Sequence, residues 1–122
     1  MARTNIRAAV NDLVFSHDLD LHEAAERHIT PDYTQRTDGH PLDHAAFLAH
    51  VANIRATVAS GSIEVHDELV DGDRYADRHT MTVTNKDGSS FRMEVYLFAE
   101  FAADGRFRHV DETTLLLDGV AP

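Results

Sequence analysis

Acidic and imidazole side chains recur at every second position in two segments of the second half of the sequence. Asp77 and His79 stand two residues apart, and His109, Asp111 and Thr113 repeat that spacing. Residues two apart in an extended strand point to the same side of a sheet. Carboxylates and imidazoles that meet on one face can exchange protons with a bound molecule. The spacing therefore predicts general acid–base chemistry.

The strands that must position these residues begin near residue 62. Three Asp-Gly pairs, at 71–72, 87–88 and 104–105, separate segments of alternating apolar and polar residues. Asp-Gly between alternating segments is a strong hairpin signal. We expect four antiparallel strands joined by three-residue loops over 70–72, 86–88 and 103–105. This register places all odd-numbered strand residues on one face and all even-numbered ones on the other.

The odd-numbered face is mainly apolar and is expected to pack against helices. Asp77 and Asp111 are predicted to lie in one cross-strand row on either side of Leu97, about 10 Å apart. A carboxylate buried without a partner is costly, so each aspartate should pair with His79 or His109 or line a wet cavity. The other residues of this face expected around the cavity are Tyr75, Val95 and Thr113.

Three helices are expected ahead of the strands, over residues 5–16, from 21 to Pro31, and 41–59. Thr4 and Asp20 are the expected N-caps of the first two helices. Pro41 suits the first turn of the third helix, and Gly61 suits its C-terminal stop. Helices followed by a meander of strands are typical of an α+β protein, with the helices packed on one side of a curved, mostly antiparallel sheet.

Two segments of the first half are expected to contribute to the cavity. The apolar stripe of the third helix includes Phe47 and Val51, and a short extended segment begins at Tyr33. These side chains would lie across from the odd-numbered face of the sheet. A single histidine on an apolar face is often an ordinary core residue. Four ionisable groups in three adjacent rows are hard to satisfy as core, which favours a ligand cavity.

Composition excludes several classes of function. The chain has 122 residues, no cysteine and a formal net charge of −10, with 43% hydrophobic residues. It therefore predicts one soluble domain over residues 1–122, without thiol chemistry. The acidic excess disfavours nucleic acid and anionic membranes as partners. There is no apolar run long enough to span a membrane, and we expect a cytoplasmic protein.

A bound metal or cofactor is not predicted. His40 and His44 stand four apart, but Pro41 between them places His40 outside the expected helix, so the two do not form a helical metal pair. The sequence contains no glycine-rich phosphate loop and no Gly-x-Ser-x-Gly motif.

The even-numbered face is mainly polar but carries the apolar side chains Tyr96, Phe98, Val110 and Leu116. We expect it to meet water or, through these residues, a second copy of the chain in a homodimer. Arg78, Tyr96 and Glu112 are predicted to share a row on this face, where an exposed ion pair is expected.

Three strings resemble the SnoaL-like group of the nuclear transport factor 2-like superfamily: PDYTQRTDGHPLDHAAFLAHV, ELVDGDRYADRHTMTVT and FAEFAADGRFRHVDETTLLLDG. Their order and spacing are similar to the family's aromatic strand, long third helix and closing hairpin. The resemblance covers nearly the whole chain. It implies a cone-shaped α+β barrel with an internal pocket. The family includes polyketide cyclases and relatives of ketosteroid isomerase and of limonene-epoxide hydrolase.

The resemblance implies an acid–base aspartate on the last strand, which falls on Asp111 or, with a shift of one residue, on Glu112. The strand register favours Asp111. In the enzyme hypothesis, Asp111 removes a proton beside the carbonyl of a small apolar ligand, helped by His79 or His109, and Tyr33 or Tyr75 donates to the developing oxyanion. This chemistry needs no cofactor.

Two departures from the family limit the resemblance, and two other functions compete with catalysis. The family commonly has an aromatic residue where this chain has His79, so the resemblance does not identify the substrate. Arg78 is expected on the face opposite the aspartates, so epoxide hydrolysis is not carried over. The competing functions are non-catalytic binding of a small apolar molecule and a dimeric scaffold role through the even-numbered face.

Overall fold

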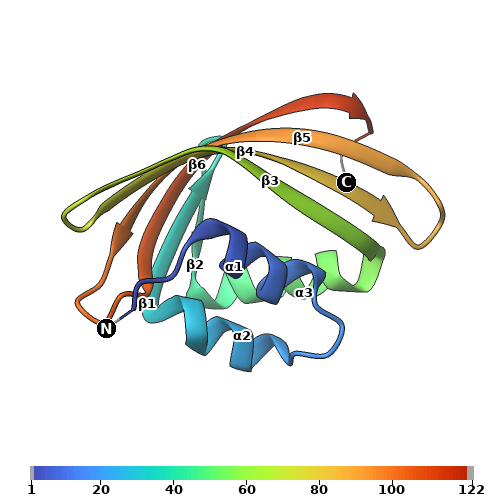
Figure 1. Ribbon diagram of the computed structural model, residues 1–122. Helices are drawn as coiled ribbons and strands as arrows, with labels where there is room; N and C mark the ends of the chain where they lie inside the picture. Colours follow the sequence, from blue (N-terminus) through green and yellow to red (C-terminus); the bar gives the residue numbers. More distant parts are fainter. Residues whose placement is uncertain (1, 121–122) are drawn as a thin grey trace.

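The computed structural model describes residues 2–120, in which helical segments cover one side of a curved, unclosed sheet (Figure 1). The helical segments are α1 (Ile6–Val10), the π-helix η1 (Asn11–Phe15), α2 (Leu21–His28) and α3 (His44–Thr57). The strands are β1 (Ile29–Thr37), β2 (His40–Asp43), β3 (Val58–Asp71), β4 (Arg74–Asn85), β5 (Ser90–Phe101) and β6 (Phe107–Gly119). The predicted α+β class is confirmed.

The six strands form one sheet in the order β2-β1-β6-β5-β4-β3. The β1–β6 pair is parallel, and the other neighbours are antiparallel. The four-stranded meander predicted from the Asp-Gly pairs is therefore confirmed as β3 to β6, and β1 and β2 extend it. The turn glycines Gly72, Gly88 and Gly105 all have positive φ, which glycine adopts without strain.

The first two helices lie where the sequence predicted them, but the second ends at His28 and not at Pro31, because residues 29–31 already belong to β1. The predicted first helix is an α-helix only to Val10 and continues as the π-helix η1, and one of the two caps also differs. Asp20 caps α2 by accepting hydrogen bonds from the backbone N–H groups of His22 and Glu23. Asn5, and not Thr4, caps α1 by accepting from Ala8 N. The Thr4 hydroxyl is engaged elsewhere, because its Oγ1 lies 2.6 Å from His28 Nδ1.

The third helix is shorter at both ends than predicted. Pro41 lies in the short strand β2, and Asp43 caps α3 by accepting from Ala46 N. The helix ends at Thr57 and the chain continues directly into β3, so Gly61 is a strand residue and not a helix stop. Gly61 is needed for packing, since an added Cβ would lie 2.1 Å from the ring of Phe15.

The predicted alternation of faces holds along β4 and β5 but fails in parts of β3 and β6. In β4 the odd-numbered residues from Tyr75 to His79 are buried, as are those of β5 from Val95 to Phe101. In β6 the register shifts by one residue at Arg108, so even-numbered residues face inward from Val110 onward. In β3 a similar shift occurs at His66. One additional residue in a strand reverses the facing of every residue beyond it.

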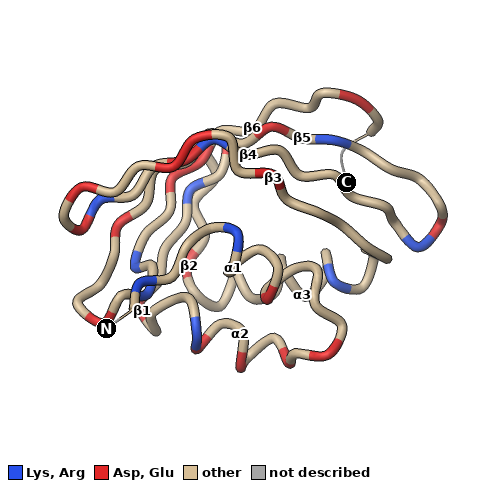
Figure 2. The backbone as a smooth tube through the Cα atoms, viewed as in Figure 1, with Lys and Arg blue, Asp and Glu red and all other residues tan. Residues whose placement is uncertain are grey.

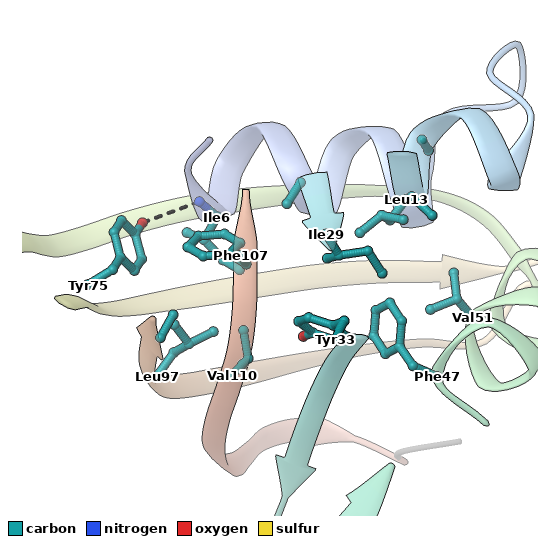
Figure 3. Close-up of a cluster of buried hydrophobic side chains, with 14 of the residues drawn as sticks. Ile6, Leu13, Ile29, Tyr33, Phe47, Val51, Tyr75, Leu97, Phe107 and Val110 are labelled. Atoms are coloured by element: carbon teal, nitrogen blue, oxygen red, sulfur yellow. Dashed lines mark hydrogen bonds between the residues drawn. The ribbon is translucent and has the colours of Figure 1, made fainter. Parts of the chain in front are cut away.

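The main core lies between the helices and the inner face of the sheet (Figure 3). Aromatic rings dominate it: Phe101 stacks on Phe107, and Tyr75 contacts both rings edge-on. Tyr33 packs against Phe47 at a centroid distance of 5.0 Å. This core fixes β1, α3 and the start of β6 relative to one another, and so positions the polar residues that follow on the same strands.

The charged residues lie mostly outside that core. Acidic residues are spread over helices, turns and strands (Figure 2). Within residues 2–120 we find no helix that combines the length and hydropathy needed to cross a membrane.

Candidate functional site

A row of polar residues crosses the inner face of the sheet. The pairing places Glu68 of β3 beside Asp77 of β4, Asp77 beside Leu97 of β5, Leu97 beside Glu112 of β6, and Glu112 beside Thr37 of β1. Asp77 and Glu112 are thus two strand spacings apart, about 10 Å between their backbones. The sequence predicted this row with Asp111 in the place that Glu112 occupies.

Asp77 and His79 form a buried hydrogen-bonded pair. Asp77 Oδ2 lies 2.8 Å from His79 Nδ1, and the two side chains are 0% and 2% exposed. A carboxylate that accepts from Nδ1–H fixes the neutral imidazole with Nε2 as the basic nitrogen. Within residues 2–120 the structure gives Nε2 no hydrogen bond. The pair therefore presents a base to the interior, held in one orientation by Asp77.

Glu112 is the second interior acid. Its Oε1 accepts from Thr37 Oγ1 at 3.0 Å and from Gln35 Nε2 at 3.2 Å. Burial raises the pKa of the Glu112 carboxyl, against the opposing effects of the Thr37 hydrogen bond and of His79; the carboxylates of Asp38 and Asp77 add to the rise. A buried carboxyl of raised pKa retains its proton at higher pH and can donate it.

Asp111 does not face the interior, and the predicted orientation is wrong. It lies on the outer face and binds Arg36, with Nη2 3.0 Å from Oδ2 and Nε 3.2 Å from Oδ1. His109 also points outward and bonds Thr34 Oγ1 at 2.7 Å, and Thr113 is exposed. The extra residue Arg108 reverses these three positions. The sequence contains one indication of this bulge. The apolar residues Phe107 and Val110, both buried, are three apart, whereas regular alternation places inward residues an even number apart.

Both predicted tyrosines face the interior, but their hydroxyl groups are engaged. Tyr33 donates to Gln35 Oε1, and Tyr75 donates to Glu68 Oε2, each at 2.5 Å. Burial raises the pKa of both phenols, with a further rise from Glu112 at Tyr33 and from the Glu68 hydrogen bond at Tyr75. Neither hydroxyl is therefore free to donate to a ligand in this structure.

The remaining predicted site residues are apolar and lie in the core. Phe47 and Val51 of α3 and Val95 and Leu97 of β5 are buried on the inner side. Figure 3 shows Phe47 beside Tyr33, and Leu97 beside Val110. The sequence missed Glu68, Gln35 and Thr37. An extended segment from Tyr33 was predicted, but its pairing with β6, which brings Gln35 and Thr37 to Glu112, was not. The His66 bulge concealed the inward direction of Glu68.

Two cavities lie on the surface of the part of the chain that the structure describes. Neither is the internal pocket predicted between the sheet and the helices. The larger, of about 470 Å³, lies beside the β5–β6 turn and includes Arg3, Phe101 and Arg108 among its lining residues. The smaller, of about 340 Å³, lies between α1 and β3. Its lining residues are Asn5, Arg7, Ala8, Asn11, Val65 and Glu68. We call it the α1–β3 cavity.

The α1–β3 cavity is adjacent to the interior pair through the strand register. Val65 is the cross-strand neighbour of His79, and Glu68 is that of Asp77. Both share the inner face with their partners. His40 lies in β2 and His44 begins α3, so the two histidines are not on one helix. Among residues 2–120 no three His, Asp or Glu side chains are grouped so as to hold a metal ion.

The outer face carries exposed apolar side chains. Leu69, Tyr96, Phe98 and Leu115 are 71%, 44%, 66% and 51% exposed, and we call them the outer patch. Val110 and Leu116, predicted here, face inward instead, because the Arg108 bulge reverses them. Arg78 pairs with Asp67 and Glu94 at the surface, and Glu112 is not its partner.

Comparison with known proteins shows the family of the chain. The model of the SnoaL-like domain matches residues 6–110. An uncharacterized protein of Schizosaccharomyces pombe is 32% identical over 105 residues, 86% of this chain and 78% of its own length.

Solved structures agree in fold at low identity. IdmH of Streptomyces antibioticus, proposed to be a polyketide cyclase, is 20% identical with a TM-score of 0.69, covering 88% of this chain and 87% of its own. An NTF2-like protein of unknown function from Exiguobacterium is 17% identical with a TM-score of 0.69, covering 90% and 96%.

Proposed function

Because the chain belongs to the SnoaL-like domain family, with an NTF2-like fold, we propose that it binds a small molecule between sheet and helices and changes it by cofactor-independent acid–base catalysis, as an isomerase or cyclase. The observation that carries this proposal is the buried Asp77–His79 hydrogen bond on the same inner face as Glu112. We expect residues 1–122 to act as one domain in the cytoplasm.

His79 takes the role of general base in this proposal. Its Nε2 accepts a proton from a ligand carbon beside a carbonyl, and the electrons of that C–H bond form a carbon–carbon double bond. Asp77 holds the ring through Nδ1 and stabilises the imidazolium that results. Asp77 is thus a positioning residue, and His79 replaces Asp111 as the group that removes the proton.

Glu112 takes the role of general acid. Its Oε1 already accepts two hydrogen bonds, so the proton of the neutral carboxyl belongs on Oε2. Oε2 donates that proton to the carbonyl oxygen as charge develops there, which gives an enol. The tyrosine hydroxyls are not needed for this step, and both are engaged with other acceptors.

Hydrogen–deuterium exchange at carbon tests the proposal without a known substrate. The protein is incubated in D2O with a panel of methyl and cyclic ketones, and loss of the C–H signals is followed by NMR. We expect exchange above buffer for at least one ketone, and a loss of roughly 10²- to 10⁴-fold in its rate for His79→Gln and Glu112→Gln. The matched control Asp111→Asn should keep the wild-type rate.

Two results would reject catalysis at this site: no exchange above buffer with any ketone, or full exchange in His79→Gln. Non-catalytic binding is the alternative, and the buried Asp77–His79 pair supports it equally. A binding protein would be favoured by a ligand that raises the melting temperature of the protein and is recovered chemically unaltered. The Asp77→Asn variant should then differ from the wild type only in its affinity for that ligand.

A homodimer through the outer patch is a second proposal. Phe98 pairs across the strands with Ala76, and Ala76 with Leu69, while Tyr96 is two residues from Phe98 on the same strand. Leu69 and Phe98 therefore share the outer face with only the small Ala76 between them, and Tyr96 lies next to Phe98 on that face. Such a patch on a sheet face favours a self-complementary contact. The scaffold role considered from the sequence would use this same surface.

A further inference from the structure

One oxygen of the interior pair has no partner. Asp77 Oδ2 bonds His79, but Asp77 Oδ1 is fully buried and accepts no hydrogen bond within the described residues. A buried polar atom without a partner destabilises the folded protein, and more so when it is charged. The inner face therefore contains an acceptor that lacks a donor.

The protein itself has few donors to offer this oxygen. The Tyr33 and Tyr75 hydroxyls donate to Gln35 and Glu68. Arg55 donates to the backbone carbonyls of Leu13, Leu19 and Asp12.

The other arginines that form ion pairs among residues 2–120 do so with acids other than Asp77 and Glu112. The inner face is consequently rich in acceptors and poor in cations.

The α1–β3 cavity adjoins the pair through the pairing of β3 with β4. Glu68 lines the α1–β3 cavity and neighbours Asp77, and the amides of Asn5 and Asn11 line the helix side. Arg7 is the cation among its lining residues and is exposed. The volume of about 340 Å³ is at the lower end of the range for small-molecule sites, roughly 300–1,000 Å³. Carboxylate and amide groups there suit a ligand that donates hydrogen bonds.

We infer that the ligand presents a hydrogen-bond donor, a hydroxyl or a protonated amine, to Asp77 Oδ1, and that molecules with a carboxylate or phosphate at this position are excluded. The inference rests on the proposed function, because it concerns the ligand of the same interior site. Together with Glu112 as proton donor, it assigns the ligand as a carbonyl compound with a hydroxyl or amino group remote from the carbonyl.

Four rigid probes test this inference. They are 6-acetyl-2-naphthol, its methyl ether, 6-acetyl-2-(aminomethyl)naphthalene and 6-acetyl-2-naphthoate, which share the acetyl group and differ at the opposite end. Dissociation constants are measured by NMR titration of the labelled protein. We expect the naphthol and the amine to bind at least about tenfold more tightly than the ether, and the naphthoate most weakly, because only the first two supply the donor that Asp77 Oδ1 lacks.

Two variants test whether Asp77 Oδ1 causes the preference for the naphthol over the ether. Asp77→Asn keeps the shape and replaces an acceptor by a donor, so the preference for naphthol over ether should fall about tenfold or reverse. Asp111→Asn removes the same charge from the outer face and should leave the preference unchanged. If Asp77→Asn does not fold, the test rests on the wild-type protein. The naphthol and the amine should then bind more tightly than the ether and the naphthoate, and they should change the amide chemical shifts of residues 77–79.

Each contrary result has a distinct meaning. Equal or tighter binding of the ether or the naphthoate would overturn the inferred ligand class. The proposed function would survive that result if ketone exchange still depended on His79 and Glu112. A naphthol preference that persists in Asp77→Asn, or failure of all four probes to bind at millimolar concentration, would also overturn it. Loss of exchange activity with an intact naphthol preference would instead reject only the catalysis.

Discussion

Asp111 and Glu112 are neighbours in the chain but lie on opposite faces of the sheet. Asp111 is half-exposed and paired with Arg36, whereas Glu112 is held by the neutral donors Thr37 and Gln35. The same contrast holds on β4, where the outward Arg78 bonds two carboxylates and the inward Asp77 bonds a histidine. On the outer face these charged groups pair with opposite charges, whereas on the inner face the acids bond a histidine or neutral donors.

The two faces should therefore respond differently to substitution of their charged residues. Exposed ion pairs contribute little to stability, and their loss is easily tolerated. Buried acids without cationic partners destabilise the fold, and they are the groups whose proton affinity changes most.

The largest effect is expected from two phenylalanines on opposite faces. Phe107 is 1% exposed in the core and Phe98 is 66% exposed in the outer patch. Phe107→Ala should lower the free energy of unfolding by about 3–5 kcal/mol, through lost burial and the cavity left behind. Phe98→Ala should change it by less than about 0.5 kcal/mol. Urea denaturation measures both, and similar values would contradict the assigned faces.

The outer patch should matter for association instead. Phe98→Glu places a charge at the centre of the proposed dimer contact, and we expect the dissociation constant of the dimer to rise at least about tenfold, equivalent to roughly 1.4 kcal/mol. Analytical ultracentrifugation over a range of concentrations measures it. Thr84→Glu, which adds the same charge to an exposed position of β4 away from the patch, is the matched control. An unchanged dimer, or no dimer in the wild type, would rule this contact out.

Glu112→Gln should raise the melting temperature at neutral pH. The pKa of Glu112 is raised in the folded protein, so the unfolded chain loses this proton first, and the wild type loses stability as pH rises above the ordinary value of 4.5. The advantage of the variant should therefore vanish below about pH 4.5. Thermal unfolding across pH 4–8 measures it.

Glu94→Gln gives the opposite sign and serves as the control for that experiment. The hydrogen bond from Arg78 lowers the pKa of Glu94, so its contribution to stability is present above the ordinary value and is lost as pH falls. The variant should be less stable than the wild type at neutral pH. The same sign for both variants would contradict the assignment of Glu112 to the interior.

The smallest effect is expected for the exposed pair. Asp111→Asn and Arg36→Gln each remove the ion pair on the outer face, and each should change the free energy of unfolding by less than about 1 kcal/mol. The change should shrink further in 1 M salt, because solvent ions screen exposed charges. A loss of several kcal/mol would mean that Asp111 is buried in solution.

Much of the fold could be predicted because its signals are local. Asp20 caps its helix through its own neighbours, and the glycines at 72, 88 and 105 supply the positive φ that hairpin turns require. The inward facing of Asp77 and His79 followed from simple alternation in β4. These features need only the few residues around them, so composition and spacing determine them.

The identity of the second acid depended on contacts between strands. Alternation from Phe107 predicts Asp111 inside, but the bulge at Arg108 turns Glu112 inward, as the one-residue alternative allowed. Likewise, Gln35 and Thr37 reach Glu112 only because β1 pairs in parallel with β6, about 75 residues away in the chain. Pairing across such a distance is set by the packing of the whole sheet, and no local pattern encodes it.

The sequence by itself determined an acidic α+β chain with a four-stranded meander, an inward aspartate–histidine pair on β4 and its family resemblance. The tertiary structure decided which carboxyl of the last strand joins that pair, where Glu68 and the α1–β3 cavity lie, and which tyrosine hydroxyls are occupied. The physical reason is that the alternation of side chains along a strand is a local property, whereas bulges and strand partners minimise the free energy of the assembled core.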